Sequence, residues 1–536
     1  MAADVDHPVL RNNRLTETGY GFTRTSQYDA LDRLTTMTFN FGSFSKIVQY
    51  TYDQNGNRKT MVYPDGFTVT YVWDADNRLT QIQITGQTWT FTYDADHRRT
   101  SAMHPNGLQL NATYDQASRL TAIRSKDGGS TVEGFTYTYD KIANRKTQGQ
   151  EANSTSLSFA YDKEYALNAT TYEPGSKAYY QYDANDNRLF RNETGKQTKY
   201  FYGIDSSISR REEYAGGSLR VTNNYTYDSN GNRLQNVKTV IGQGQTTYNY
   251  QYDLENRLTK VLSGNTEIAS YGYFSDGSRI RRTASGTAAY FLYDFKDFNG
   301  YNDIIAEYDA SGNMLARYVH GPGIDEPLAM NRGGSWYYYH FDGLGSVTML
   351  TRSDKTVANR YVYDDFGGFR SRTEAVTNPY AYTGREYDSA VDLIFYRARY
   401  YDPLIGRFLT RDPVGMVDGA NVYAYVGNNP VNSVDPSGRW HCGWWDWGCW
   451  FNEFRCYICV SLTALVLRSL LLFGFRAIMG APVCTAFASW ACGLLVTGGG
   501  LGMLICVGII WAVCQAIIAI WAVVTATAAC HLAGAC

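Results

Sequence analysis

The chain has 536 residues, which is long enough for two or more domains. Its 49 basic and 51 acidic residues give a net charge of −2, so composition offers no electrostatic case for binding nucleic acid or an anionic membrane. The 45 tyrosines favour strands and the 50 glycines favour turns, whereas 12 prolines argue against a disordered linker protein. We therefore expect a mainly β protein without a nucleic-acid partner.

The N-terminal sequence MAADVDHPVLRNN lacks the basic segment and apolar run of a secretory signal peptide. If the protein leaves the cell, we expect another export route or a larger secreted assembly. The chain also begins almost inside its first repeat, which leaves open a longer natural protein or a shortened copy.

A repeat with a period near 21 residues follows, as in YTYDQNGNRKT and QYDLENRLT. Each copy runs from an alternating aromatic stretch into a turn of Asp, Asn and Gly, which predicts a hairpin. One hairpin cannot bury its own face, so we predict a continuous winding sheet. The repeated arginine pairs with turn carboxylates, stacks on tyrosines or is solvated. The turn aspartates are Asp53, Asp74, Asp94, Asp115, Asp140, Asp162, Asp183, Asp228 and Asp253, with weaker copies at Asp294 and Asp309.

These copies, over residues 25–320, resemble the tyrosine-aspartate (YD) repeats of the Rhs family. The resemblance implies that the repeats wind into a hollow β-shell, or cocoon. We assign residues 1–320 to this shell. A chain of 536 residues would make a small shell for the family, and its closure is left open.

Residues 321–439 carry a different pattern, which resembles the Rhs repeat-associated core domain. The resemblance implies that this domain caps the shell and cuts its own chain by a reaction similar to aspartyl proteolysis. The matching blocks are residues 339–342, 344–346, 382–386, 397–403, 406–408 and 425–430.

The catalytic candidates are Asp412 in RDPVG and Asp435 in VDPSG, with Arg411 as an orienting or charge-stabilising neighbour. Two close carboxylates do not ionise together easily, so one can hold a proton while the other activates a water. Asp418 in MVDG is a weaker third candidate. The alternative is that both Asp-Pro-x-Gly motifs are simply turns, because Asp caps its own backbone and Pro and Gly suit turn geometry.

The expected cut lies near Arg439-Trp440. The family usually has leucine after the second Asp-Pro-x-Gly motif, whereas this chain has Arg439. If the site selects leucine, cleavage is slow, shifted or lost.

Residues 440–536 have their own composition, with no Asp, Glu, Lys or Arg from 477 onward. Their apolar runs are long enough for membrane helices. Three interpretations are open: a membrane hairpin, a zinc site at Cys456-x-x-Cys459 and a disulfide-bonded mini-protein. The lack of a second closely spaced cysteine pair argues against zinc. We expect no metal or cofactor. The disulfide candidates are Cys442, Cys449, Cys456, Cys459, Cys484, Cys492, Cys506, Cys514, Cys530 and Cys536.

The cysteine pattern also resembles the microhalocins, which are small halocin-type bacteriocins. The parallels are the Cys456-x-x-Cys459 pair, Val-Cys-Thr at 483–485 and Cys-Gly-Leu-Leu at 492–495. The resemblance implies a small α-helical, disulfide-rich, hydrophobic toxin domain. The tail has only two histidines and few acids, so we do not expect it to be an enzyme.

We therefore predict an Rhs-family polymorphic toxin for interbacterial competition. Its YD-repeat shell would encapsulate and deliver a halocin-like, membrane-active bacteriocin and release it by autoproteolysis. We expect the protein to be secreted or at the cell surface, with a secretion apparatus, a cognate immunity protein and the target-cell membrane as partners. Two alternatives remain: a surface protein anchored by its tail helices, and a carbohydrate-binding surface protein that stacks sugars on its tyrosines.

Overall fold

A computed structural model describes residues 15–172, 175–295, 301–439 and 442–443 of the chain. The chain divides into two compact units, residues 1–449 and 450–536. The second unit lies outside the described residues, and of the predicted helical, disulfide-rich tail, residues 440–536, only 442–443 are described. The first unit is described below.

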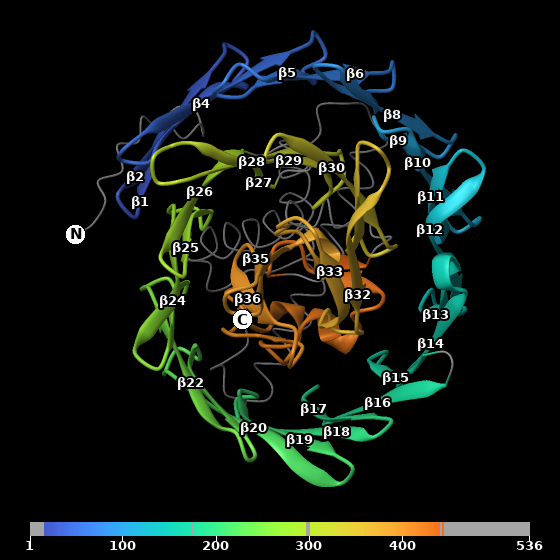
Figure 1. The fold of residues 1–536 in the computed structure, drawn as a ribbon, viewed down its shortest axis with the longest axis vertical. Coiled ribbons are helices and arrows are strands. Elements are labelled where there is room, and N and C mark those ends of the chain that lie inside the picture. Colours follow the sequence, from blue (N-terminus) through green and yellow to red (C-terminus); the bar gives the residue numbers. More distant parts are fainter. Residues whose placement is uncertain (1–14, 173–174, 296–300, 440–441, 444–536) are drawn as a thin grey trace, which may run out of the picture. The chain divides into compact units, whose positions relative to one another are not determined.

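Thirty-three strands form one antiparallel sheet in which each strand pairs with the next one along the chain (Figure 1). This confirms the predicted mainly β fold with a continuous winding sheet. The strands up to the predicted end of the shell are β1 Thr16–Gly19, β2 Phe22–Tyr28, β3 Leu34–Asn40, β4 Ser45–Tyr52, β5 Arg58–Val62, β6 Thr68–Trp73, β7 Leu79–Ile84, β8 Gln87–Tyr93, β9 Arg99–Met103, β10 Leu108–Tyr114, β11 Leu120–Asp127, β12 Ser130–Tyr139, β13 Arg145–Gln150, β14 Thr155–Tyr161, β15 Leu167–Tyr172, β16 Ser176–Tyr182, β17 Arg188–Glu193, β18 Lys196–Tyr202, β19 Ile208–Ala215, β20 Ser218–Tyr227, β21 Arg233–Val240, β22 Gly244–Tyr252, β23 Leu258–Ser263, β24 Thr266–Tyr273, β25 Arg279–Ala284, β26 Thr287–Asp294, β27 Asp303–Tyr308 and β28 Met314–His320.

The same sheet continues past residue 320 and then gives way to short elements. A four-stranded sheet, β34 to β37, follows it, and β38 pairs with β39. The remaining elements are β29 Pro327–Arg332, β30 Ser335–Phe341, β31 Val347–Arg352, β32 Val357–Tyr363, β33 Phe369–Glu374, β34 Glu386–Asp388, β35 Leu393–Tyr396, β36 Arg399–Asp402, β37 Arg407–Phe408, β38 Ser433–Val434 and β39 Cys442–Gly443, with 3-10 turns η1 Glu151–Asn153, η2 Tyr382–Gly384, η3 Gly415–Asp418 and η4 Val426–Asn428.

Each of the nine strong YD turns, from Asp53 to Asp253, is closed by its own aspartate. Asp74 Oδ1 accepts the backbone N–H groups of Asp76 at 3.0 Å and Arg78 at 2.9 Å, and Arg78 Nε donates to Asp74 Oδ2 at 2.8 Å. The Arg78 guanidinium also lies 5.4 Å from the centre of the Tyr93 ring, whose hydroxyl donates to the Leu79 carbonyl at 2.7 Å. The repeated arginine therefore both pairs with the turn carboxylate and stacks on the tyrosine of the next repeat.

We call the 33-stranded sheet the wall. The wall returns on itself, because its first hairpin, β1 and β2, packs against the turn between β24 and β25. Glu17 Oε1 accepts the backbone N–H of Asp276 at 2.8 Å, and Arg24 pairs with the Asp276 carboxylate at 3.0 Å. At Gly19 a Cβ atom would lie only 2.7 Å from the Phe274 Cα. Side chains and closely packed backbone make this contact, and it places the first hairpin beside β24 and β25, which are far from it in sequence.

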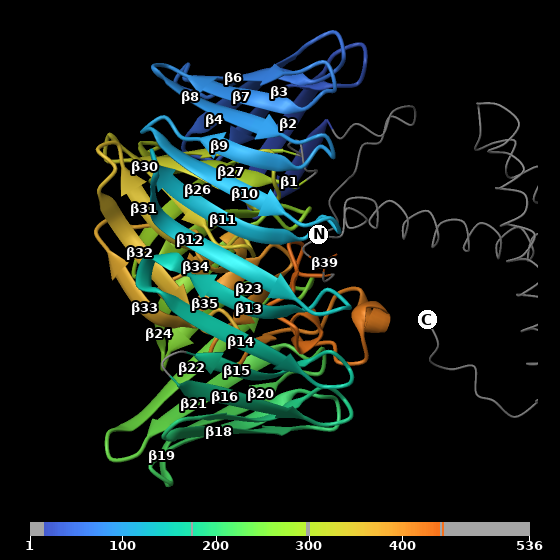
Figure 2. The same ribbon diagram turned by 90° about the vertical axis from the view of Figure 1, so that its right-hand side faces the viewer.

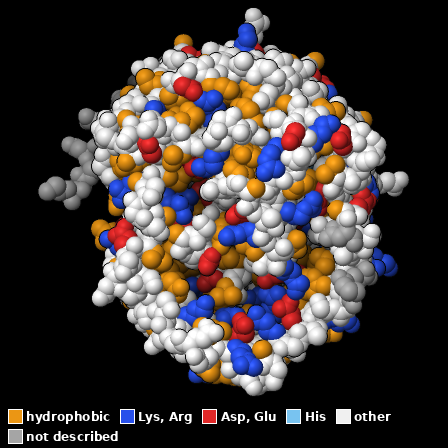
Figure 3. Space-filling model, viewed as in Figure 1, with side chains coloured by type: hydrophobic (Ala, Val, Ile, Leu, Met, Phe, Trp, Pro, Cys, Tyr) orange, Lys and Arg blue, Asp and Glu red, His pale blue; other side chains and the backbone are white. Residues whose placement is uncertain are grey.

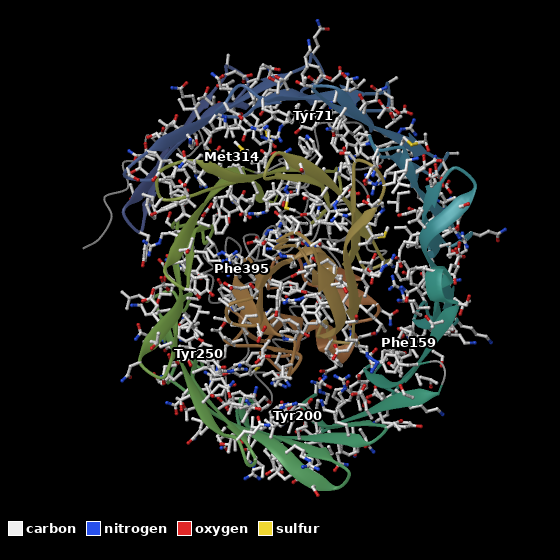
Figure 4. All side chains as sticks on the ribbon, viewed as in Figure 1. Tyr71, Phe159, Tyr200, Tyr250, Met314 and Phe395 are labelled. Carbon is white, nitrogen blue, oxygen red and sulfur yellow. The ribbon has the colours of Figure 1, made fainter. Side chains whose placement is uncertain are left out.

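Later wall strands form a second layer inside the first repeats. One aromatic and aliphatic core joins buried residues of 22–137 with those of 274–380. Tyr63 on the outer layer, for example, donates its hydroxyl to the Tyr318 carbonyl of β28 at 2.7 Å. Figure 4 shows the labelled wall residues Tyr71, Tyr200 and Tyr250 on the inner side of the sheet, and all three are buried.

Most of the YD turns meet at one edge of the sheet, because alternate turns of an antiparallel sheet share an edge. We call this edge the YD rim, defined by the turns at residues 140–144, 183–187, 203–207 and 228–232. Residues 405–432 run along it, at the right of Figure 2. Its contacts with the rim are Arg407 Nη2 to the Ser206 carbonyl at 2.7 Å, Asn421 Nδ2 to the Asn185 carbonyl at 2.9 Å and the Tyr423 hydroxyl to the Gly231 carbonyl at 2.9 Å.

Candidate active site

The structure brings the two predicted aspartates together around one arginine. Asp412 follows β37 and Asp435 follows β38, and both side chains are buried. Asp412 Oδ2 lies 2.7 Å from Arg399 Nη2, and Asp435 Oδ2 lies 3.4 Å from the same nitrogen. The two carboxylate oxygens are therefore no further apart than these two distances added, about 6 Å. Their catalytic role stays a prediction.

The other oxygen of each carboxylate closes a turn. Asp412 Oδ1 accepts the backbone N–H of Val414 at 2.9 Å. Asp435 Oδ1 accepts the backbone N–H of Arg439 at 3.0 Å and the hydroxyl of Ser437 at 3.2 Å. The two interpretations of the Asp-Pro-x-Gly motifs are thus compatible, because Oδ1 caps the turn and Oδ2 faces the arginine.

Arg399 was not among the residues predicted from sequence. It opens β36, its side chain is 2% exposed, and its guanidinium carbon lies 3.6 Å from the centre of the Phe408 ring. Its Nε donates to the Gly438 carbonyl at 2.5 Å and its Nη1 to the Val422 carbonyl at 3.2 Å. One buried cation shared by two carboxylates is well compensated, because each charge has hydrogen-bonding partners.

The other predicted site residues lie elsewhere. Arg411 Nη2 donates to Asp205 Oδ2 at 2.8 Å on the YD rim, where its side chain is 41% exposed, so Arg399 occupies the position expected for Arg411. Asp418 ends η3, and its side chain lies outside the described part. Arg439 is exposed, whereas Trp440 lies outside the described residues, as do the side chains of all ten disulfide candidates.

A second charged region lies inside the wall. A cavity of about 510 Å³ is bounded by strands β25 to β28 and by residues 374–389. Its charges are paired: Arg282 binds Asp388 at 2.5 and 2.7 Å, and Arg332 binds Glu307 at 2.8 Å. Figure 3 shows further basic and acidic side chains gathered around a hollow on the face seen in Figure 1.

Neither a metal-binding cluster nor a helix that could cross a membrane is found in the part of the chain that the structure describes. Within it, no three His, Cys, Asp or Glu side chains are grouped to hold a metal ion. Its helices are all too short to cross a bilayer.

The sequence matches the Teneurin YD-shell family over residues 5–232 and 114–431. The chain therefore belongs to the Teneurin YD-shell family.

Two curated relatives are named as nucleases. The tRNA nuclease WapA of Bacillus subtilis is 30% identical over 77% of this chain and 15% of its own length. The probable deoxyribonuclease RhsB of Dickeya dadantii is 26% identical over 72% of this chain and 28% of its own length. The chain thus spans less than a third of the length of either relative.

The fold is shared with a solved structure. The TcdB2-TccC3-Cdc42 crystal structure matches 82% of this chain and 24% of that chain, with a TM-score of 0.61 and 17% identity. At this identity the likeness concerns the fold alone.

These relatives confirm an Rhs-type YD-repeat protein. The expectation that nucleic acid is not a partner is not supported, because the relatives are named as nucleases. The halocin-like, membrane-active tail is not supported either, and the anchor and carbohydrate-binding alternatives are not favoured.

Proposed function

We propose that residues 1–439 form the delivery shell of a polymorphic toxin and that this shell cuts its own chain after Arg439. One observation carries the proposal: the Oδ2 atoms of Asp412 and Asp435 converge on one nitrogen of Arg399, beside the backbone of residues 436–439. In a pair of carboxyl groups this close, one can act as the general base and the other as the general acid.

The reaction is hydrolysis of a single peptide bond. One carboxylate of the pair accepts a proton from a water whose oxygen attacks the Arg439 carbonyl carbon. The other, protonated carboxyl gives its proton to the amide nitrogen of Trp440 as the C–N bond breaks. Arg399 stabilises the negative charge that develops nearby. The products are a carboxylate at Arg439 and an amine at Trp440, and Asp435 stays with the shell.

For the released tail, residues 440–536, we propose a membrane-active, halocin-like toxin. Its ten cysteines and the absence of charged residues from 477 onward support this proposal. The names of the relatives favour a nucleic-acid-degrading effector as the second candidate. An immunity protein and a secretion apparatus are the partners that either effector would need.

The cut is tested by expressing the intact protein beside Asp412→Asn and Asp435→Asn variants and measuring fragment masses. Asparagine keeps the turn-capping oxygen but removes the charge facing Arg399, so we expect a fragment beginning at Trp440 in wild type only. Asp205→Asn, a turn aspartate outside the site, is the matched control and should be cut. An uncut wild-type chain would remove the protease proposal.

The two effector classes are separated in cells that express the full chain. Loss of membrane potential with intact tRNA and DNA supports the membrane-active tail. Degraded tRNA or DNA with the potential maintained supports the nuclease instead.

A further inference from the structure

The segment before the proposed cut is held residue by residue by another segment. Residues 436–438 lie against residues 396–399, at the turn between β35 and β36. The approach is so close that a Cβ atom on Gly438, whose φ is +70°, would lie 2.1 Å from the Tyr396 carbonyl oxygen. The hydrogen bonds are Arg397 Nη1 to the Pro436 carbonyl at 2.6 Å, Ala398 N to the Ser437 carbonyl at 3.2 Å and Arg399 Nε to the Gly438 carbonyl at 2.5 Å.

Arg397 differs from the other two residues because it also binds the wall. Its Nη2 lies 2.7 Å from Asp325 Oδ1 and 3.4 Å from Asp303 Oδ1. Asp303 opens β27, and Asp325 lies in the turn between β28 and β29. A single guanidinium therefore joins the Pro436 carbonyl to two points of the wall.

On the wall side of this contact, the turn that carries Asp325 is tightly packed. Asp325 has a left-handed backbone with φ of +54° and receives a second arginine, Arg385, at 2.6 Å. Gly384 packs so tightly on this turn that a Cβ there would lie 2.1 Å from the Asp325 carbonyl oxygen. Both carboxylates are nearly fully buried, so loss of Arg397 would leave them with reduced compensation.

We propose that Arg397 is a positioning residue that makes cleavage depend on docking of the wall strands β27 to β29. The inference rests on the proposed function. When these strands are docked, Asp303 and Asp325 hold Arg397, and Arg397 holds the Pro436 carbonyl. This fixes the following residues, so the Arg439 amide meets Asp435 and the Gly438 carbonyl meets Arg399.

A wall that has not closed lacks Asp303 and Asp325 at this place. Arg397 then loses its support, and the segment of residues 436–438 loses its register against Arg399. Small displacements of reacting groups slow reactions severely, by about 100-fold for about 1 Å. The device thus keeps the tail attached until the shell around the site has formed.

The test measures the rate of fragment appearance during pulse-labelled synthesis of the full chain. Arg397→Lys keeps the charge but loses the planar fork, and Asp325→Asn keeps the shape but loses the charge. We expect each variant to be cut about 10- to 100-fold more slowly than wild type, a far larger loss of rate than the control variant below shows for a comparable fall in melting temperature. Since both act through one contact, the double variant should be no slower than the slower single variant.

Arg191→Lys is the matched control. Arg191 also binds two carboxylates, Asp364 at 2.7 Å and Glu193 at 3.0 Å, and its side chain is 15% exposed against 17% for Arg397. It lies on β17, away from the cleaved segment, so we expect the wild-type rate. The pH profile of cleavage should keep its shape in Arg397→Lys and change in the Asp412 and Asp435 variants, because Arg397 transfers no proton.

The outcomes separate this inference from the proposed function. An uncut wild-type chain overturns both. A cut wild-type chain with Arg397→Lys cut at the same rate overturns only the positioning role. Equal slowing in Arg397→Lys and Arg191→Lys, or multiplied losses in the double variant, also overturns it, because general damage to packing would explain either result.

Discussion

Asp412 and Asp435 direct their Oδ2 atoms to the same nitrogen of Arg399, while each uses its Oδ1 atom to close its own turn. Two turn sequences thereby become one charged centre without losing their local role. The turns hold the carboxylates in place before any chemistry takes place, so the centre is preorganised.

Replacing Arg399 by lysine should slow cleavage about 100-fold, because lysine is a point charge that does not serve two carboxylates and the Gly438 carbonyl together. Arg411→Lys should be cut at nearly the wild-type rate, since Arg411 pairs with Asp205 on the YD rim. The fraction of cut chain against time checks both. A slow Arg411 variant and a normal Arg399 variant would restore the assignment expected from sequence.

Replacing Gly438 by alanine should strongly reduce cleavage. Its φ is +70°, and the new Cβ would lie 2.1 Å from the Tyr396 carbonyl oxygen, so the segment has to move out of register. Gly415→Ala is the control, because Gly415 has a φ of +73° but no atom within 4 Å of the added Cβ. It should lose only about 1 kcal/mol of stability from backbone strain. Equal cleavage in the two variants would contradict the close approach.

The stability of the shell should fall as the pH drops below 6.5, because of two buried histidines. Burial lowers the pKa of His104 to about 4 and lowers that of His340 well below 6.5; nearby Arg99 and Arg360 act in the same direction. The rings lie 5.3 Å apart, and His340 hydrogen-bonds Ser125 and Thr351.

The sign follows from proton uptake. A folded-state pKa below the unfolded value means that the unfolded chain binds more protons, so the stabilisation is complete above about pH 6.5 and is lost as the pH falls toward 4. Each histidine contributes at most about 1.4 kcal/mol per pH unit. Denaturation midpoints between about pH 8 and pH 5 should show a smaller drop in His104→Asn than in wild type. His97→Asn, at an exposed turn, is the control, and an identical drop in all three chains would refute the prediction.

Replacing Arg233 by methionine should cost about 3–5 kcal/mol of folding free energy. Arg233 is fully buried and binds Asp402, the last residue of β36, at 2.8 Å, so the substitution leaves a buried carboxylate without its arginine. Lys355→Met removes an ion pair with Asp127 of 2.7 Å, but these side chains are 38% and 47% exposed and the pair should contribute no more than about 1 kcal/mol. Urea denaturation compares the two, and similar losses would show that burial does not decide the effect.

The repeat could be predicted from the sequence because its contacts join residues that are close in the chain. The tyrosine, aspartate and arginine of one repeat interact within one hairpin or with the next, as in Asp74, Arg78 and Tyr93, so the spacing predicts the hairpins. The structure then selects two of the three roles left open for the arginine, namely pairing and stacking. The two catalytic candidates were named from motifs that resemble the Rhs core domain, and the alternative prediction, that each aspartate closes a turn with its own neighbours, depends on local contacts as well.

The arginine between the aspartates could not be found in this way. Arg411 is next to Asp412 in the chain, but its side chain binds Asp205. Arg399 lies on β36, and its guanidinium packs on the Phe408 ring. The same holds for Arg397, whose carboxylate partners lie on the wall at Asp303 and Asp325. The sequence by itself determined the hairpins and the turns, since these depend on contacts between neighbours in the chain. Only the tertiary structure decided which charges meet, because buried charges pair with whatever partners packing brings within reach.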